Sequence, residues 1–415
     1  MRPPTNTFSD PLLSLQDVEA AHHRLRGAIQ FTPCDQSTAL SELVGCRVYC
    51  KREYLQRTGS FKERGARNAL SLLTPGERTR GVIAASAGNH ALGLSCHGRD
   101  LSIPVTVVMP RYAPLSKVTA CRRFGARVVL EGETFDQAGR HAEDLAHREN
   151  LVYIHPFDDS RVMAGQGTVA LEVVEQVPDL DAVVVPVGGG GLLAGVATVL
   201  RALKPDVRII GVEPANAACF SAAWTHHHPV TVQTHFTVAD GLAVAQAGTQ
   251  TFATAFPLVD RVLTVSEEAL ALAILRLAEL EKAVVEGAGA APLAALLSGA
   301  LPELAGQNVV LLLTGGNVDP LTLGRIIAKS LAADGRIYRF NALISDRPGG
   351  LAGLSAMLAG VEANVTEIVH NRTFAGPDLS LVQVLCTVET RDHRHIAEIN
   401  RRLAAGGIQL VPSPV

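Results

Sequence analysis

Short apolar runs and longer amphipathic segments alternate along the chain between residues 47 and 313. Runs rich in Val, Ile, Ala and Leu stand at residues 81–85, 104–109, 182–187 and 308–313, and segments with apolar residues at helical spacing lie between them. Runs that are apolar at every position are typical of strands buried on both faces of a parallel sheet, which needs helices to cover it. The pattern therefore predicts an α/β fold with two doubly wound sheets.

The two predicted sheets follow one another in the sequence, after a helix at 15–29 with Ser14 as its N-cap and a short strand at 47–51. The first uses strands at 81–85, 104–109, 126–130 and 151–154 and helices at 89–99, 115–124 and 135–149. We expect it to form a smaller, mobile subdomain over residues 54–160. The second uses strands at 182–187, 208–213 and 308–313 and helices at 164–175, 192–203, 266–281 and 288–298.

Residues 219–256 interrupt this pattern with a polar segment that is broken by Pro, Gly and His. Its three consecutive histidines, His226, His227 and His228, are residues of the type that binds metals. Three adjacent residues do not share one face of a helix or of a strand, so they are poorly placed to converge on one ion. We interpret them as part of an exposed loop.

The periodicity changes after residue 334. Strands are predicted at 336–343, 364–372, 379–389 and 407–411, helices at 351–360 and 392–405, and turns at 346–350 and around Gly376 and Pro377. The order strand–helix–strand–strand–helix–strand is that of a split βαβ, ferredoxin-like unit. We therefore expect two domains, residues 1–334 and residues 335–415, and the second contains no candidate nucleophile or acid pair.

Composition narrows the class of protein. The 415 residues are 47% hydrophobic, which allows a large core, and a net charge of −3 gives no electrostatic case for binding nucleic acid. No segment is long and apolar enough to span a bilayer, and the first residues lack the apolar core of a signal peptide, so we expect a cytoplasmic protein. The seven cysteines are scattered and odd in number, as in a reducing compartment. Cys46 and Cys50 have no second pair with which to bind zinc.

Candidate chemistry begins at Lys62, in the stretch Ser60-Phe61-Lys62. A good helix start follows it, and the positive end of a helix dipole disfavours the charged form of an amine. A neutral amine is a nucleophile that can form an imine with an aldehyde. On Lys62 alone, a solvated helix lysine is the simpler interpretation.

Two further stretches change that interpretation. A predicted strand runs into Gly188-Gly189-Gly190-Gly191-Leu192 and then into a helical pattern, which places bare backbone N–H groups where they can bind a phosphate. Four glycines exceed what a strand–helix turn requires, and the motif lacks the Lys-Ser/Thr of a nucleotide loop. The segment Ser86-Ala87-Gly88-Asn89-His90 likewise follows a strand. An imine-forming lysine, a phosphate cradle and a polar helix-capping loop together indicate pyridoxal phosphate.

These motifs, together with Thr314-Gly315-Gly316-Asn317, have the order and spacing of a known family over about residues 15–330. The chain resembles the threonine/serine dehydratases, which are fold-type II pyridoxal phosphate enzymes. Its C-terminal part resembles an ACT regulatory domain, as found in the medium-length threonine ammonia-lyases.

The resemblance implies a role for each motif. Lys62 would hold the cofactor as a Schiff base and then act as general base. Gly188, Gly189, Gly190, Gly191 and Leu192 would bind the phosphate, while Phe61 packs on the ring, Asn89 bonds the ring 3′-oxygen and Thr314 faces the pyridine nitrogen. The substrate carboxylate would be received by Ser86, Ala87, Gly88, Asn89 and His90. Gly349, Gly350 and Asn364 resemble the amino-acid-binding positions of ACT domains.

Two positions depart from related enzymes. Serine racemases have a second Ser where Ala87 stands, and that Ser exchanges a proton on the opposite face, so racemisation is expected to be poor. Glu213 and Ala217 match a divalent-metal site of related enzymes, but Cys219 replaces its Asp. Because a hard cation prefers oxygen ligands, we expect no metal there.

The leading functional hypothesis is α,β-elimination of L-threonine to 2-oxobutanoate and ammonia, with L-serine as a secondary substrate. A dehydratase for 3-hydroxyaspartate or a β-aryl serine, and a serine racemase, remain alternatives. Intact Lys62, Asn89 and glycines argue against a non-enzymatic amino-acid sensor. An amino-acid effector, allosteric regulation within isoleucine biosynthesis, and a homodimer or homotetramer are expected by resemblance. Substrate preference, a biosynthetic or catabolic role and the effector's identity are left open.

Overall fold

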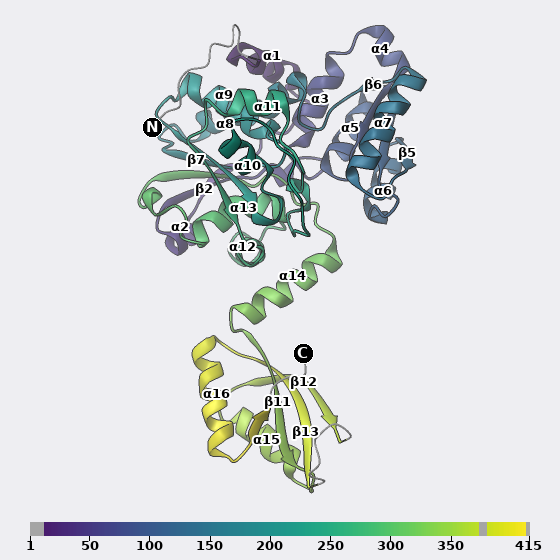
Figure 1. Cartoon of the computed structure of the whole chain (residues 1–415). Coiled ribbons are helices and arrows are strands. Elements are labelled where there is room, and N and C mark those ends of the chain that lie inside the picture. Colours follow the sequence, from purple (N-terminus) through teal and green to yellow (C-terminus); the bar gives the residue numbers. More distant parts are fainter. Residues whose placement is uncertain (1–11, 373–379, 412–415) are drawn as a thin grey trace. The chain divides into compact units, whose positions relative to one another are not determined.

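The computed structural model describes residues 12–372 and 380–411 (Figure 1). The chain divides into two compact units, Met1–Asp319 and Pro320–Val415, and each is described by itself. Among the described residues, no helix has the length and apolar character needed to cross a membrane.

The larger sheet of the first unit has six strands in the order β1-β2-β10-β7-β8-β9. Its strands are β1 (Cys34–Ser37), β2 (Arg47–Lys51), β7 (Ala182–Pro186), β8 (Arg208–Pro214), β9 (Arg261–Val265) and β10 (Asn308–Leu312). Only the β1–β2 pair is antiparallel, and the other neighbours are parallel. The interior strands β7 and β10 are almost entirely buried, as their unbroken Val and Leu runs predict.

The smaller sheet is parallel throughout, with the order β5-β4-β3-β6. Its strands are β3 (Val82–Ala85), β4 (Val105–Met109), β5 (Arg127–Leu130) and β6 (Val152–Tyr153). The carboxyl ends of parallel strands meet at one edge of a sheet, so the loops that follow them are brought together there. The two predicted α/β sheets are therefore confirmed.

Thirteen helices accompany these sheets in the described part of the first unit. They are α1 (Leu15–Leu25), α2 (Thr38–Val44), α3 (Lys62–Ser71), α4 (Pro75–Arg80), α5 (Asn89–Asp100), α6 (Leu115–Arg123), α7 (Phe135–Glu149), α8 (Ser160–Gln176), α9 (Gly191–Leu203), α10 (Cys219–His226), α11 (Thr249–Ala255), α12 (Glu267–Leu280) and α13 (Gly287–Leu297). Short 3₁₀ turns are η1 (Glu53–Leu55), η2 (Ala215–Ala217), η3 (Asp240–Leu242) and η4 (Pro302–Leu304).

Helix α3 packs against α5 and α8, and α8 in turn packs against α9. Glycines make these approaches close. A Cβ added to Gly165 on α8 would lie 2.5 Å from the Arg64 carbonyl oxygen of α3. A Cβ on Gly195 of α9 would lie 2.6 Å from the Gly167 nitrogen of α8. The helix that begins at Lys62 is thus held backbone to backbone against the centre of the unit.

Several sequence expectations need correction. The first helix ends at Leu25 rather than residue 29, because Gly27 adopts a left-handed φ of 73°. The segment 219–256 is not simply polar and broken, since it contains α10 and α11, whose Phe220 and Phe252 rings pack with centroids 5.5 Å apart. His226 ends α10 and His227 caps it, and all three consecutive histidines are exposed.

The second unit contains α14 (Pro320–Ala333), β11 (Ile337–Ser345), α15 (Gly350–Ala359), β12 (Asn364–Asn371), β13 (Leu381–Glu389), α16 (His393–Ala405) and β14 (Gln409–Val411). Its antiparallel sheet has the order β12-β13-β11-β14, which is the order of a ferredoxin-like unit. Alternate residues of β13 are buried against the core. The predicted order of strands and helices is confirmed, whereas α14 was not predicted. The turn expected at Gly376 and Pro377 lies outside the described residues.

Candidate active site

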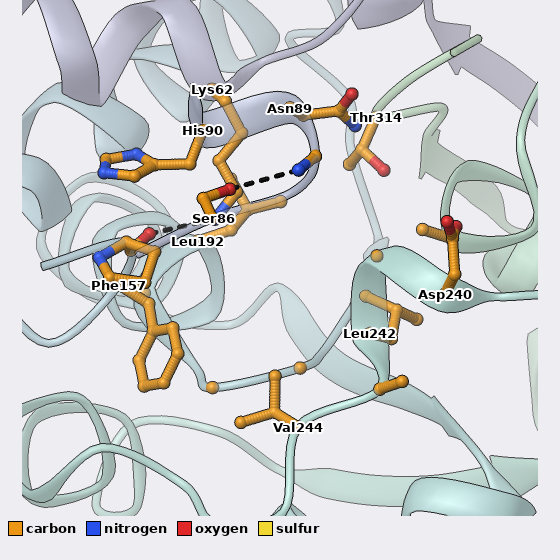
Figure 2. Close-up of a pocket in the computed structure, with 18 of the residues that line it drawn as sticks. Lys62, Ser86, Asn89, His90, Phe157, Leu192, Asp240, Leu242, Val244 and Thr314 are labelled. Carbon is orange, nitrogen blue, oxygen red and sulfur yellow. Dashed lines mark hydrogen bonds between the residues drawn. The ribbon is translucent and has the colours of Figure 1, made fainter. Parts of the chain in front are cut away.

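Loops from both sheets of the first unit surround a cavity of about 330 Å³ (Figure 2). Lys62 and the loop after β3 lie on one side, and the segment containing Leu242 and Val244 lies on another. The loop after β7 also lines the cavity. All the residues predicted to form the catalytic and cofactor sites line this cavity. Tertiary structure therefore collects positions that are as far apart as Phe61 and Thr314 in the sequence.

Lys62 is the first residue of α3, as the helix-start pattern predicts. The loop before it is tied to a distant segment, because the Phe61 N–H donates to the Thr314 carbonyl (3.0 Å) and the Gly316 N–H donates to the Gly59 carbonyl (3.0 Å). The Lys62 amine donates to the carbonyl oxygen of Pro156 (2.9 Å). Burial lowers the pKa of Lys62 to about 8, although the Glu286 carboxylate opposes this shift. A large share of the amine is therefore neutral at mildly alkaline pH, which makes it a nucleophile.

The four glycines form the turn between β7 and α9. Gly190 is the N-cap of α9 with φ of 97°, a conformation that other residues rarely adopt. The backbone N–H groups of Gly188, Gly189 and Gly190 have no acceptor among residues 12–372 and 380–411. A Cβ on Gly189 would lie 2.3 Å from the Phe157 ring. The loop thus presents free donors at a helix N-terminus and has no room for side chains, as a phosphate cradle requires.

The loop from Ser86 to His90 caps α5. The Ser86 hydroxyl accepts hydrogen bonds from the backbone N–H groups of Gly88 (3.2 Å) and Ala91 (3.3 Å). The N–H groups of Ala87, Asn89 and His90 have no acceptor in the described part of the chain. These donors at the helix N-terminus suit a carboxylate.

His90 is a neutral ring in this setting. Burial and, to a lesser extent, the positive charge of Lys62 lower its pKa to about 3. Its Nε2 lies 3.3 Å from the Ile154 carbonyl oxygen, which can only accept, so Nε2 carries the proton. The ring is thus hydrogen-bonded to the backbone rather than aimed at Asn89 and Thr314 (Figure 2).

Asn89 belongs to a chain of side-chain hydrogen bonds that sequence reasoning did not find. Its Nδ2 donates to Glu286 Oε1 (2.6 Å), and its Oδ1 accepts from Asn317 Nδ2 (2.8 Å). Burial and, to a lesser extent, the charge of Asp240 raise the pKa of Glu286 to about 7. The only sequence signal was a lone acid at the N-cap of a Gly- and Ala-rich helix, which is too common to indicate a site.

Other cavity residues define the walls. Phe61 contacts Lys62, with the amine 5.3 Å from the ring centroid. Thr314 is buried, and its carbonyl holds Phe61. Ala87 and Leu192 line the cavity together with Phe157, which sequence reasoning missed. Lys117 and Asp240, also missed, form an ion pair at 2.9 Å between α6 and η3.

The position compared with a metal site holds a different arrangement. The Glu213 carboxylate accepts hydrogen bonds from the backbone N–H groups of Phe220 (2.9 Å) and Ser221 (2.6 Å) at the start of α10. Burial raises the pKa of Glu213 to about 7. The Cys219 thiol lies 3.7 Å from the Gly188 carbonyl oxygen, to which it donates. Over the described ranges, no group of three or more His, Cys, Asp or Glu residues is placed to hold a metal ion.

The residues compared with an effector site all lie in the second unit. Gly349 has φ of 98° and is the N-cap of α15, and a Cβ on Gly350 would lie 2.1 Å from the Ser345 carbonyl oxygen. The Asn364 amide donates to Glu389 on the neighbouring strand (2.9 Å).

The cavity fits pyridoxal phosphate by its own donors. A partly buried amine with a lowered pKa can bond covalently to an aldehyde, and unpaired N–H groups at the start of α9 can receive a phosphate. The two features line one cavity, so a single molecule can meet both.

Comparison with known proteins agrees with this class. A family model described as "Pyridoxal-phosphate dependent enzyme" matches residues 25–315. The chain belongs to the family of pyridoxal-phosphate dependent enzymes, and pyridoxal phosphate is its cofactor. The predictions of fold class and cofactor are confirmed.

Individual relatives are more specific. L-threonine ammonia-lyase of Thermotoga maritima is 42% identical over 399 residues, which is 96% of this chain and 99% of that protein. The processed form of threonine deaminase isoform 2 from Solanum lycopersicum has a structure similar to this one, with TM-score 0.74 and 38% identity over 80% of this chain and 91% of that chain. Serine racemase from Dictyostelium discoideum is also similar, with TM-score 0.70 and 35% identity over 74% and 99%.

Proposed function

We propose that the chain is a threonine ammonia-lyase, which converts L-threonine to 2-oxobutanoate and ammonia and accepts L-serine less well. The observation that carries this proposal is the partly buried amine of Lys62, whose pKa is lowered and which shares one cavity with the glycine cradle and the N-terminus of α5. The similarity to an L-threonine ammonia-lyase over nearly the full length supports the choice of substrate.

Each element of the cavity has a task in this reaction. Lys62 would hold the cofactor, Gly188 to Leu192 would receive its phosphate, and Phe61, Asn89 and Thr314 would contact its ring. When bound, pyridoxal phosphate supplies an electron sink for the negative charge that develops at the substrate Cα.

The chain's own groups bind the substrate and move the proton. The free N–H groups of Ala87, Asn89 and His90 bind the substrate carboxylate and so fix the position of Cα. The Lys62 amine, neutral above a pH of about 8, takes the proton from Cα. Phe157, Leu242 and Val244 form an apolar wall that limits the access of water (Figure 2).

Steady-state kinetics on a panel of β-hydroxy amino acids tests the proposal. The panel contains L-threonine, L-serine, 3-hydroxyaspartate and β-phenylserine, with keto acid measured for each. We expect the highest kcat/KM for L-threonine. A higher kcat/KM for 3-hydroxyaspartate or β-phenylserine, or no keto acid from L-threonine by cofactor-loaded protein, would refute it.

The two-domain division is part of the proposal. Residues 1–334 would be the catalytic domain, with residues 54–160 as a mobile small subdomain, and residues 335–415 an ACT-like regulatory domain. The ferredoxin-like strand order of the second unit supports the regulatory assignment. A branched-chain amino acid such as isoleucine or valine is the effector that a role in isoleucine biosynthesis would require.

Gly349, Gly350 and Asn364 would form the effector site, and a matched pair of variants tests it. A Cβ at Gly350 would meet the Ser345 carbonyl at 2.1 Å, whereas a Cβ at Gly353 on the same helix would meet nothing within 4 Å. We expect isoleucine or valine to shift the thermal midpoint and the threonine saturation curve of the unaltered protein and of Gly353→Ala, but not of Gly350→Ala. If neither amino acid shifts the unaltered protein, the effector proposal is wrong.

Assembly and location complete the proposal. β12 is an edge strand of eight residues, and such edges need covering, which supports pairing into a homodimer or homotetramer. Light scattering after size exclusion measures the mass, and a monomer would contradict this.

All seven cysteines are buried free thiols, which supports a cytoplasmic location.

A further inference from the structure

The orientation of the Asn89 carboxamide follows from one backbone carbonyl. Asn317 Nδ2 donates to the Thr58 carbonyl oxygen (2.7 Å) and to Asn89 Oδ1 (2.8 Å). A carbonyl oxygen can only accept, so Asn317 has to turn its amino group toward Thr58 and therefore toward Asn89. Asn89 must then present its oxygen to Asn317, which leaves its amino group facing Glu286 Oε1 at 2.6 Å.

We propose that Asn317 and Glu286 are positioning residues, which hold the Asn89 carboxamide so that the second N–H of Nδ2 stays available to an acceptor in the cavity. This inference rests on the proposed function, in which Asn89 contacts the cofactor ring. The acceptor class is an oxygen with negative charge, such as the phenolic oxygen of the cofactor. No other acceptor for Asn89 Nδ2 exists among the described residues.

Backbone contacts around Asn317 and Asn89 fix the positions of the groups that make these hydrogen bonds. Thr58 is held because its N–H donates to the Glu63 carboxylate, and Gly59 is bonded to both Gln56 and Gly316. A Cβ on Gly315 would lie 2.3 Å from Glu286 Oε1 and 3.2 Å from Asn89 Nδ2. The loop that carries Asn317 can approach the pair this closely only with glycine at 315.

Glu286 accepts rather than donates once its carboxylate is ionised. Burial raises its pKa to about 7, and Asp240 adds to that rise, while Lys117, the Asn89 amide and the Asn317 backbone N–H lower it. The Lys62 amine also faces it. Above a pH of about 7 the ionised carboxylate has no proton to donate, so it favours the Asn89 amino group over the amide oxygen.

Two substitutions at Asn317 separate this role from simple packing. Asn317→Asp keeps the size but replaces the donor with an acceptor, so Asn89 is expected to turn its amino group toward Asp and its oxygen toward the cavity. Asn317→Ala removes the side chain and leaves the Glu286 preference intact. We expect the Kd for pyridoxal phosphate to rise roughly tenfold or more in Asn317→Asp, the equivalent of one lost hydrogen bond, and to rise less in Asn317→Ala. A packing role alone gives the opposite order.

The control is Asn216→Asp, because that exposed amide also donates to a backbone carbonyl, that of Phe236 (2.6 Å), away from the cavity. Its Kd should be unchanged. A second readout is the pH titration of the bound cofactor's absorbance. Its apparent pKa should move upward in Asn317→Asp, because a lost donor favours the protonated ring oxygen.

A double variant guards against a folding defect. Asn317→Asp with Glu286→Gln offers the reversed carboxamide an acceptor on one side and a donor on the other. We expect its thermal midpoint without cofactor to rise above that of Asn317→Asp but to stay below that of the unaltered protein, because the Thr58 carbonyl still lacks its donor, while the affinity for pyridoxal phosphate stays low.

The inference is overturned if the Kd of Asn317→Asp for pyridoxal phosphate lies within twofold of that of the unaltered protein. If Asn317→Asp does not fold, the same criterion applies to the double variant. It is also overturned if Asn317→Ala binds more weakly than Asn317→Asp. These readouts need no turnover. Protein that binds the cofactor but forms no keto acid from threonine refutes the proposed function and leaves this test intact.

Discussion

Replacing Arg64 should lower the stability of the first unit more than replacing any surface arginine. Arg64 lies two residues after Lys62 on α3 and is 1% exposed. Its Nε and Nη2 donate to the two oxygens of Glu53 (2.8 and 2.7 Å), and its Nη1 and Nη2 donate to those of Glu172 (2.6 and 2.9 Å). Lys51, fully buried, also donates to Glu172 (2.5 Å). Two cations thus balance two carboxylates away from water.

The size of the stability loss follows from the hydrogen bonds and charges that remain around the two carboxylates in Arg64→Met. Glu53 would keep hydrogen bonds only from Thr32 Oγ1 (2.5 Å) and Gln56 Nε2 (3.3 Å), and Lys51 alone would face two buried carboxylates. Breaking a buried pair by removing one partner costs about 3–5 kcal/mol. We therefore expect the free energy of unfolding to fall by that amount at pH 8.

The loss should depend on pH. Burial raises the pKa of Glu53, but the charge and hydrogen bonds of Arg64 outweigh burial and hold it below its ordinary value. Without Arg64 the pKa of Glu53 rises in the folded protein, which then binds more protons than the unfolded chain does. Stability of the variant should therefore fall as pH rises, so the loss should be larger at pH 8 than at pH 5.

Urea unfolding of the cofactor-free protein measures the effect, because bound cofactor would add its own stabilisation. Trp224 is the only tryptophan and packs against Phe256 with ring centroids 4.8 Å apart, so its fluorescence reports on the first unit. Arg261→Met is the matched control, since that arginine pairs with Glu303 at 3.3 Å with half of its side chain exposed. The control should change stability by less than about 1 kcal/mol. Equal losses in the two variants would refute the reasoning.

Three further outcomes are expected. The rate of cofactor binding to cofactor-free protein should rise with pH through about 8, where the Lys62 amine loses its proton. A rate that is flat between pH 7 and pH 9 would contradict the lowered pKa of Lys62. Lys62→Ala should abolish both the covalent absorbance and turnover. Gly189→Ala should weaken cofactor binding at least tenfold, because its Cβ would lie 2.3 Å from the Phe157 ring. The control Gly139→Ala has open space around its Cβ and should leave cofactor binding unchanged. Equal affinities of the two variants in a fluorescence titration would argue against the glycine cradle. Ala87→Ser should raise the rate at which L- and D-serine interconvert, measured by chiral chromatography, and an unaltered protein that already racemises serine as fast as it forms keto acid would overturn the role assigned to Ala87.

Local patterns in the sequence predicted much of the fold. Unbroken Val and Leu runs identified the interior strands β7 and β10, since a strand covered on both faces needs apolar residues throughout. The strands β1 and β9 were missed, because each is short and partly exposed and so lacks that signal. Helix α10 was missed because the histidines at its end obscured the buried Phe220 near its start.

The sequence by itself determined the family, the cofactor and the residues of the four motifs, because each motif is a local run: glycines that leave backbone N–H groups free, and a lysine at a helix start. Only the tertiary structure decided which distant groups act on them. Glu286 and Asn317 reach Asn89 across about 200 residues of chain through hydrogen bonds that no local pattern encodes. The lowered pKa of Lys62 arises first from burial, which depends on how the elements around the cavity pack together rather than on the residues beside Lys62 in the sequence.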